Sequence, residues 1–174
     1  AIIDLVSGDQ PLYEPGGGAL VANGEFYNYV ELRAAMDGVA FTTRSDCEPP
    51  LHLYRRHGLD FVQHLRGMYA IAIHDPAADR LVLARDPFGI KPLYYTETDR
   101  LFAFASEPQA LIAAGLAGRG LGDMAVKELL QLQFTTGAET IFGDIKRVLP
   151  GETLAVAGGR IVERRSRAAL PEGA

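Results

Sequence analysis

Val21-Ala22-Asn23-Gly24-Glu25-Phe26-Tyr27-Asn28 is the stretch around which the rest of this sequence is arranged. Apolar residues precede it at 18–22 and recur at helical spacing after it, so Asn23-Gly24-Glu25 is predicted to lie where a strand ends and a helix begins. Asn-Gly accepts a positive φ and leaves backbone N–H groups outside a strand ladder, while the Asn23 amide is a donor and Glu25 is an anion. These groups suit a zwitterionic ligand. Asn-Gly is also the commonest tight hairpin turn, so a purely structural turn is the alternative interpretation.

Composition indicates one folded domain. The 174 residues are 48% apolar and 22% charged, which is ordinary for a globular protein that buries a core. A net charge of −5 argues against nucleic acid as a partner. The longest apolar run, 68–73, is too short to cross a bilayer, and nothing near Ala1 has the layout of a secretory signal. We therefore expect a cytoplasmic protein without a membrane partner.

Metal and cofactor motifs are missing from the sequence. The single cysteine, Cys47, excludes an internal disulfide and a cysteine-based metal site, and is compatible with a reducing compartment. The four histidines form no i,i+4 pair and no His-Glu-x-x-His run, so no metal site is predicted. Neither a dinucleotide-binding glycine motif nor a P-loop occurs.

Apolar periodicity and turn residues predict alternating hairpins and helices. Helices are expected at 28–36, after Pro49-Pro50 on the spacing of Leu51, Leu53, Tyr54 and His57, and at 108–114 and 124–132. Strands are expected around 41–43 and in the pairs 68–73 with 80–85, 93–96 with 101–105, and 152–157 with 160–164. Antiparallel connections with strands apolar on both faces favour an α+β domain of sheets covered by helices. A doubly wound parallel fold is the less favoured alternative.

Three polar positions have a structural interpretation beside a functional one. Ser45 or Asp46 is a natural N-cap for the following helix, although Asp46 would also face a ligand. Arg85-Asp86 puts opposite charges in a turn between apolar strands, where burial requires pairing, so a structural role is favoured. Cys47 lies near a helix N-terminus, which lowers a thiol pKa, but the sequence offers it no acid–base partner.

Both ends of the sequence suggest a piece of a longer protein. Ala1 begins inside what looks like a strand, and 164–174 loses apolar periodicity and gains proline and glycine. The expected domain is therefore 1–163, lacking its extreme N-terminus, with 164–174 as a linker. The arginine cluster in this tail is expected to be solvated.

Six motifs occur in order: Ile2-Ile3-Asp4, Gln10-Pro11-Leu12, Asn23-Gly24-Glu25-Phe26-Tyr27-Asn28, Ser45-Asp46-Cys47-Glu48, Leu65-Arg66-Gly67-Met68-Tyr69-Ala70 and the run from Ala84 to Tyr95. With 104–107 and 149–152 they resemble the class II glutamine amidotransferase domain, most closely that of glutamine-hydrolysing asparagine synthetases. The resemblance implies an N-terminal-nucleophile hydrolase fold. Such a fold is a four-layer αββα sandwich in which two antiparallel sheets lie between helical layers.

The resemblance also implies the chemistry and its residues. In that family an N-terminal cysteine attacks the glutamine side-chain amide, its own α-amine serves as base, and the released ammonia passes to a second domain. That cysteine and the segment expected just before Ala1 are not in this sequence. The resemblance assigns Asn23 and the Gly24 N–H to the oxyanion hole, Glu25 and Asp46 to the α-amino group, Ile2 and Ile3 to the pocket lining, and Asn28 to bracing the loop.

Two functions remain open on the sequence alone. In the first, the domain hydrolyses glutamine and supplies ammonia to a synthetase domain, which makes asparagine from aspartate. This domain itself would need no cofactor or metal, whereas ATP and Mg²⁺ are expected in the absent synthetase domain. In the second, the chain lacks a nucleophile and only binds glutamine or braces a partner domain. A homodimer is compatible with either function.

Overall fold

The chain folds into short strands and helices that follow one another closely. The structure is a computed structural model and describes residues 9–170. Its elements are β1 Leu12–Tyr13, β2 Ala19–Phe26, α1 Tyr29–Ala34, α2 Pro49–His57, the 3₁₀ helix η1 Gly58–His64, β3 Gly67–Asp75, β4 Arg80–Arg85, β5 Tyr94–Glu97, β6 Phe102–Ala105, α3 Pro108–Ala113, α4 Asp123–Leu132, β7 Lys146–Arg147, β8 Glu152–Ala157 and β9 Arg160–Ser166. Prolines open both α2 and α3, where a missing N–H costs nothing.

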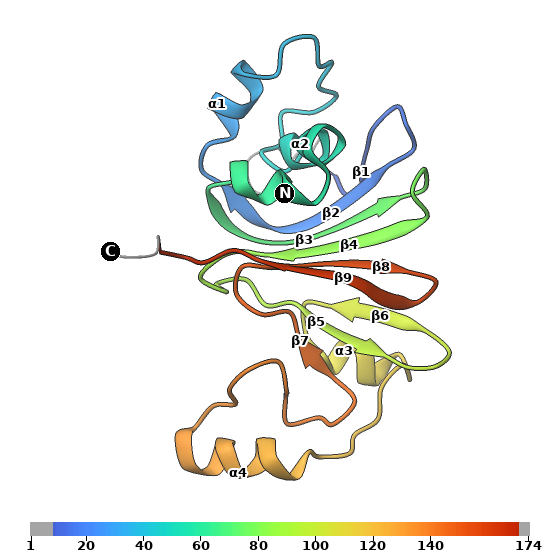
Figure 1. Cartoon of the computed structure of the whole chain (residues 1–174), viewed down its shortest axis with the longest axis vertical. Coiled ribbons are helices and arrows are strands. Elements are labelled where there is room, and N and C mark those ends of the chain that lie inside the picture. The colour runs from blue at the N-terminus through green and yellow to red at the C-terminus, as the bar shows by residue number, and fades with distance from the viewer. Residues whose placement is uncertain (1–8, 171–174) are drawn as a thin grey trace.

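Two antiparallel sheets form the centre of the molecule. One has six strands in the order β1-β2-β3-β4-β8-β9, and the other has three in the order β6-β5-β7. α1 and α2 cover the outer face of the larger sheet, and α3 lies against the smaller sheet on the opposite side (Figure 1). This is the α+β sandwich of helix, sheet, sheet and helix layers that the sequence predicted.

The central strand β3 explains why these strands are apolar on both faces. Successive side chains of a strand point to opposite faces of its sheet. Ile71 and Ile73 belong to the core beneath α2, whereas Ala70 and Ala72 pack toward Tyr95 of the smaller sheet. Both faces of the larger sheet are therefore buried, and alternating polar residues have no place in β3.

Three local expectations were wrong. Residues 41–43 form no strand, and α1 covers only Tyr29–Ala34 rather than 28–36. The strand β2 does not end at the Asn-Gly dipeptide but continues to Phe26, with Asn23 opposite Ala70 and Gly24 opposite Tyr69 of β3. Asn-Gly is thus neither a junction nor a hairpin turn.

The boundary at residue 163 also needs correction, because β9 runs to Ser166. Arg164 donates to Glu152 Oε1 at 2.8 Å and to the Tyr95 hydroxyl at 3.0 Å. Residues 164–166 therefore belong to the sheet and not to a linker. The sequence concealed this because β9 is an edge strand whose side chains are mostly exposed, so no apolar alternation marks it. Within residues 9–170 none of the helices has the length and apolar character needed to span a bilayer.

Candidate functional site

The outer edge of β2 is open where the sequence motif lies. β1 pairs only with Ala19 and Leu20, and no other described strand occupies that edge. The Gln10 side chain takes the place of a strand at Ala22, accepting from its N–H at 2.6 Å and donating to its carbonyl at 2.9 Å. Backbone groups of alternate residues face the same edge of a strand. The Gly24 N–H, two residues further along β2, therefore also faces this open edge, away from β3.

Gly24 is a glycine because two backbones approach closely. A Cβ there would lie 2.3 Å from the Met68 carbonyl oxygen and 2.7 Å from Tyr69 Cα, both on β3. Gly24 is not among the described glycines with positive φ, so the expectation of a left-handed conformation was wrong. The residue keeps β2 and β3 in register, and its N–H on the other side has no partner among residues 9–170.

Asn23 points away from the helices, into a space between the two sheets. It lines a cavity of about 190 Å³ together with residues of β2, β3, β6 and the neighbouring loops, namely Gln10, Val21, Ala22, Ala70, Ile71, Ala72, Leu93, Phe104 and Ser106. The Asn23 side chain is exposed and has no hydrogen-bond partner among the described residues. Its amide is thus available as a donor beside the Gly24 N–H.

Asp46 reaches the end of the same strand from a distant loop. Its side chain is buried and its Oδ2 accepts from the Phe26 backbone N–H at 2.8 Å. Capping of α2, one of the two interpretations, is wrong, because the N-cap position is Glu48 and makes no side-chain capping bond. The bond to Phe26 brings Asp46 beside the strand residue that follows Glu25. Glu25 is half-buried and has no side-chain partner among residues 9–170.

The remaining candidate residues are Asn28, which the structure describes, and Ile2 and Ile3, which it does not. Asn28 donates to the His64 carbonyl at 2.9 Å and accepts from the Arg66 N–H at 2.9 Å, so it joins the end of β2 to the start of β3. This is the bracing expected of it. Ile2 and Ile3, predicted to line the pocket, lie outside the described residues.

Cys47 is in no position to act as the nucleophile. Burial, followed by the charge of Asp46, raises the pKa of its thiol to about 12. Its Sγ lies 3.7 Å from Asp46 Oδ1, and its side chain is buried. The reactive form of a cysteine is the thiolate, so this thiol is chemically inert near neutral pH. No group of three or more His, Cys, Asp or Glu suited to a metal ion occurs in the part of the chain that the structure describes.

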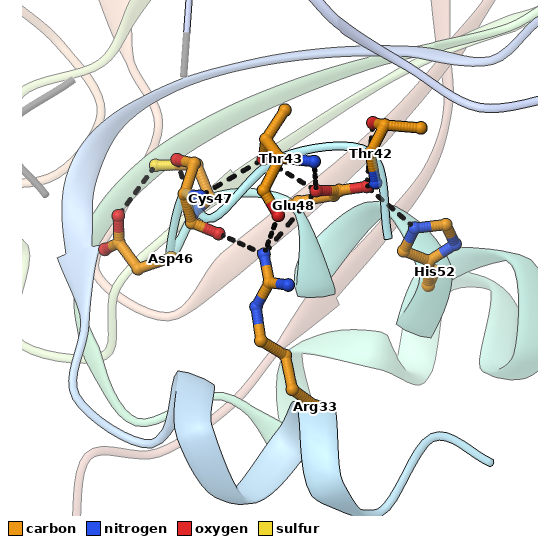
Figure 2. A network of polar contacts seen from close by, with 8 residues as sticks. Arg33, Thr42, Thr43, Asp46, Cys47, Glu48 and His52 are labelled. Carbon is orange, nitrogen blue, oxygen red and sulfur yellow. Dashed lines mark hydrogen bonds and ion pairs between the residues drawn. The ribbon is translucent and has the colours of Figure 1, made fainter. Parts of the chain in front are cut away.

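Sequence reasoning missed a group of buried polar contacts that hold the loop carrying Asp46. Glu48 is 1% exposed and lies two residues after Asp46, at the centre of a group of contacts that we call the Glu48 network (Figure 2). The network consists of Glu48, Thr42, Thr43, Arg33 and His52. The motif Ser45-Asp46-Cys47-Glu48 contained the signal, but no local pattern connects it to Arg33 on α1, fifteen residues before Glu48.

The half-buried Arg85 and the buried Asp86 form a second polar group, with the structural role that was favoured. They make no ion pair with each other in the described structure. Arg85 donates to the carbonyls of Gly89, Lys91 and Val148, each at 2.7 Å. Backbone groups thus satisfy these charges, rather than the opposite charge that the sequence suggested.

Two antiparallel sheets between helical layers define the N-terminal-nucleophile hydrolase type of fold, and the sequence motif with Asn23 and Gly24 lies at an edge of β2 that no described strand occupies. Residues 1–166 match the family model described as a glutamine amidotransferase domain. The chain therefore belongs to the glutamine amidotransferase domain family.

Several known proteins are similar to this chain. Asparagine synthetase [glutamine-hydrolyzing] 1 of Bacillus subtilis is 38% identical over 159 residues, which are 90% of this chain and 25% of that protein. Asparagine synthetase [glutamine-hydrolyzing] 2 of the same organism is 47% identical over 114 residues, 65% of this chain and 15% of that protein. Amidase chry2 of Gibberella zeae is 37% identical over 88% of this chain and 23% of its own length. The chain thus spans a quarter or less of these relatives.

Solved structures support the fold. Glutamine phosphoribosylpyrophosphate amidotransferase from B. subtilis superposes with a TM-score of 0.64 at 24% identity, over 90% of this chain and 31% of that one. A class II glutamine aminotransferase domain protein from Silicibacter pomeroyi gives a TM-score of 0.53 at 16% identity, over 94% of this chain and 72% of that one.

Proposed function

We propose that this domain binds glutamine at the open edge of β2 and releases ammonia from it for an amide synthetase. The observation that carries the proposal is the placement of the Gly24 N–H on an edge of β2 that no described strand occupies, one residue after an Asn23 side chain that has no hydrogen-bond partner among residues 9–170. Two donors aimed at a developing oxyanion stabilise the tetrahedral intermediate of amide hydrolysis, and one side-chain donor of this kind typically contributes about 3–4 kcal/mol. Glu25 and Asp46 supply the two negative charges that an α-ammonium group needs.

The nucleophile in this proposal is an N-terminal cysteine ahead of the described residues, as in the family. Its thiolate adds to the carboxamide carbon, its α-amine takes the thiol proton and delivers it to the departing nitrogen, and ammonia leaves. Water then cleaves the thioester and glutamate is released. A polypeptide that begins at Ala1 should bind but not turn over glutamine. The second candidate, a binding domain without hydrolysis, has the same pocket and differs only in this cysteine.

The acceptor of the ammonia is proposed from the relatives. Two of them are glutamine-hydrolysing asparagine synthetases, so we propose aspartate as acceptor, with ATP and Mg²⁺ used in a separate synthetase domain. A homodimer and a cytoplasmic location are part of the same proposal. The residues that select the acceptor would lie outside this domain.

Asn23→Ala tests the oxyanion assignment in the full-length parent protein proposed here, which begins with the family's cysteine and carries the synthetase domain. The donor acts mostly after the carbonyl carbon becomes tetrahedral, so kcat should fall about a hundredfold or more while the apparent affinity for glutamine changes little. Synthesis driven by free ammonia should survive, because it bypasses the glutamine site. If both activities fell together, or if only KM rose, Asn23 would be a structural residue and the assignment would be wrong.

Asp46→Asn tests recognition of the α-amino group. The asparagine can still accept from the Phe26 N–H, so thermal stability should be kept while the negative charge is lost. Calorimetry should find weaker binding of glutamine but unchanged binding of glutaramate, which is glutamine without its α-amino group. Equal affinity of parent and variant for glutamine would refute the role of Asp46.

A further inference from the structure

The loop that carries Asp46 is held by a buried carboxylate. Glu48 Oε1 accepts from the Thr42 N–H at 2.7 Å and the Thr42 hydroxyl at 3.0 Å. Its Oε2 accepts from the Thr43 N–H at 2.8 Å and the Thr43 hydroxyl at 2.6 Å. Four hydrogen bonds to one buried anion fix the chain before Asp46 to the start of α2, which follows Asp46.

Arg33 fastens the same loop to α1. Its Nη2 donates to the carbonyls of Thr43 at 2.8 Å and Ser45 at 2.9 Å, and lies 3.5 Å from Glu48 Oε2. The guanidinium also lies over the Phe41 ring, 4.2 Å from its centroid. One nitrogen of Arg33 therefore contacts three points of the loop (Figure 2). The Phe41 ring beside the guanidinium restrains its direction.

These contacts link β2, α1 and the loop that carries Asp46 into a closed circuit of chain connections and hydrogen bonds, and this circuit includes the candidate site. β2 ends at Phe26 and leads directly into α1, which carries Arg33. Arg33 holds the Ser45 carbonyl, and the next residue, Asp46, returns to the Phe26 N–H. The position of the Asp46 carboxylate relative to the end of β2 is thus determined by Arg33 and Glu48, although neither has a contact with β2 among those described.

We propose that Arg33 and Glu48 are positioning residues that set Asp46 beside Glu25 and thereby determine selectivity for a ligand bearing an α-ammonium group. This inference rests on the proposed function and adds a specificity role to residues outside the pocket. A carboxylate that can swing away loses its preference for a fixed ammonium, because the interaction falls with distance and with solvent access. Disturbing the network should therefore weaken binding of glutamine selectively.

Arg33→Met is the principal test, since it removes the donors and the charge but keeps an unbranched chain of similar length. Calorimetry on the 174-residue chain should find glutamine bound about tenfold more weakly, and glutaramate bound within about twofold of the parent. Arg33→Lys should restore part of the preference, because a lysine also offers several N–H donors from one nitrogen. Glu48→Gln should resemble Arg33→Met and serves in its place if that variant does not fold.

Arg164→Met is the matched control. Arg164 also contacts a carboxylate, Glu152, and a second partner, the Tyr95 hydroxyl, but it lies on β9 away from the open edge of β2. It should leave the preference for glutamine over glutaramate unchanged. The proposal is overturned if Arg33→Met weakens both ligands equally, or if Arg164→Met has the same effect on the preference.

Amide hydrogen exchange separates this proposal from the proposed function. The Phe26 N–H is protected by Asp46 and the Lys91 N–H by Asp86, so their exchange rates report the two loops without any ligand. Arg33→Met should accelerate exchange at Phe26 about tenfold or more and leave Lys91 unchanged. If the parent binds neither glutamine nor glutaramate, the proposed function is wrong. If Arg33→Met leaves the exchange rate of the Phe26 N–H unchanged, the positioning role of Arg33 is wrong, whatever the binding result.

Discussion

Two buried carboxylates, Asp86 and Glu48, are bonded in different ways. Asp86 is 0% exposed and accepts from four backbone N–H groups, those of Tyr69, Phe88, Ile90 and Lys91. Three of the four donors lie within five residues of it. Glu48 is equally buried but receives half of its short hydrogen bonds from threonine hydroxyls, and Arg33 approaches it from α1.

This difference indicates that Asp86 mainly stabilises the fold, whereas Glu48 also supports the candidate site. The donors to Asp86 are peptide groups, which are present whatever the neighbouring side chains are, so Asp86 stabilises its loop against β3 without further specialised partners. The Glu48 network requires particular side chains, namely the hydroxyls of Thr42 and Thr43, six and five residues before Glu48, and the guanidinium of Arg33 on α1. We therefore expect Asp86 to dominate stability, and Glu48 to affect both stability and ligand preference.

Asp86→Ala should have the largest effect on stability. Removing the carboxylate leaves four N–H groups without their acceptor in a buried region, so urea denaturation should find a loss of about 3–5 kcal/mol. Asp99→Ala is the control, because the Asp99 side chain is 98% exposed and its only described ion pair, with Arg160, is at the surface. A loss no larger than that of Asp99→Ala would mean that the loop holds without Asp86. If Asp86→Ala does not fold, Asp86→Asn gives the same comparison.

Glu48→Gln should have an intermediate effect that depends on pH. Burial raises the pKa of Glu48, but the hydrogen bonds from Thr43 and Thr42 outweigh it, and the pKa lies below its usual value of 4.5. A carboxyl group with a lowered folded-state pKa contributes stability above its unfolded pKa, and this is lost as the pH falls through the folded pKa. Urea denaturation near neutral pH should find a loss of about 1–3 kcal/mol relative to the parent.

Urea denaturation of the parent and of Glu48→Gln near pH 3 tests whether the charge of Glu48 is what stabilises the protein. The difference in unfolding free energy between parent and Glu48→Gln should shrink there, because the parent begins to lose the charged form that the variant lacks. Other acidic groups titrate in both proteins and cancel in this difference. A difference that stays constant between neutral and acid pH would show that the charge of Glu48 contributes nothing.

Thr43→Val should have the smallest effect of the three. It removes the hydroxyl that donates to Glu48 at 2.6 Å and accepts from the Ser45 N–H at 3.1 Å, but leaves the Thr43 backbone bonds to Glu48 and Arg33 in place. A loss of about 1 kcal/mol is expected in urea denaturation, with glutamine preference kept. Thr136→Val removes a hydroxyl bond of the same length, 2.6 Å to Glu128, at an exposed position, and should cause no measurable loss. Equal losses at both positions would mean that burial does not strengthen the network.

Secondary structure and layers could be predicted because they leave periodic signals. The hairpin of β3 and β4 follows from two apolar runs around Asp75-Pro76, and both α2 and α3 begin at prolines, as anticipated. The end of β9 was misplaced because an exposed edge strand has no buried face to mark it. The assignment of Asn23 and Gly24 to the site stays a prediction, whereas the conformation expected of them was wrong, because β2 continues through both residues.

By itself, the sequence determined the class of fold, the family and the stretch that bears the candidate donors, because strand alternation, turn residues and ordered motifs are local properties of the chain. Only the tertiary structure decided that Gly24 is needed for the approach of β3, that Asp46 binds Phe26 twenty residues away, and that Arg33 and Glu48 hold it there. The physical reason is that periodicity reports which side of an element is buried. Which donor meets which acceptor depends on how separate elements pack, and no local pattern contains that information.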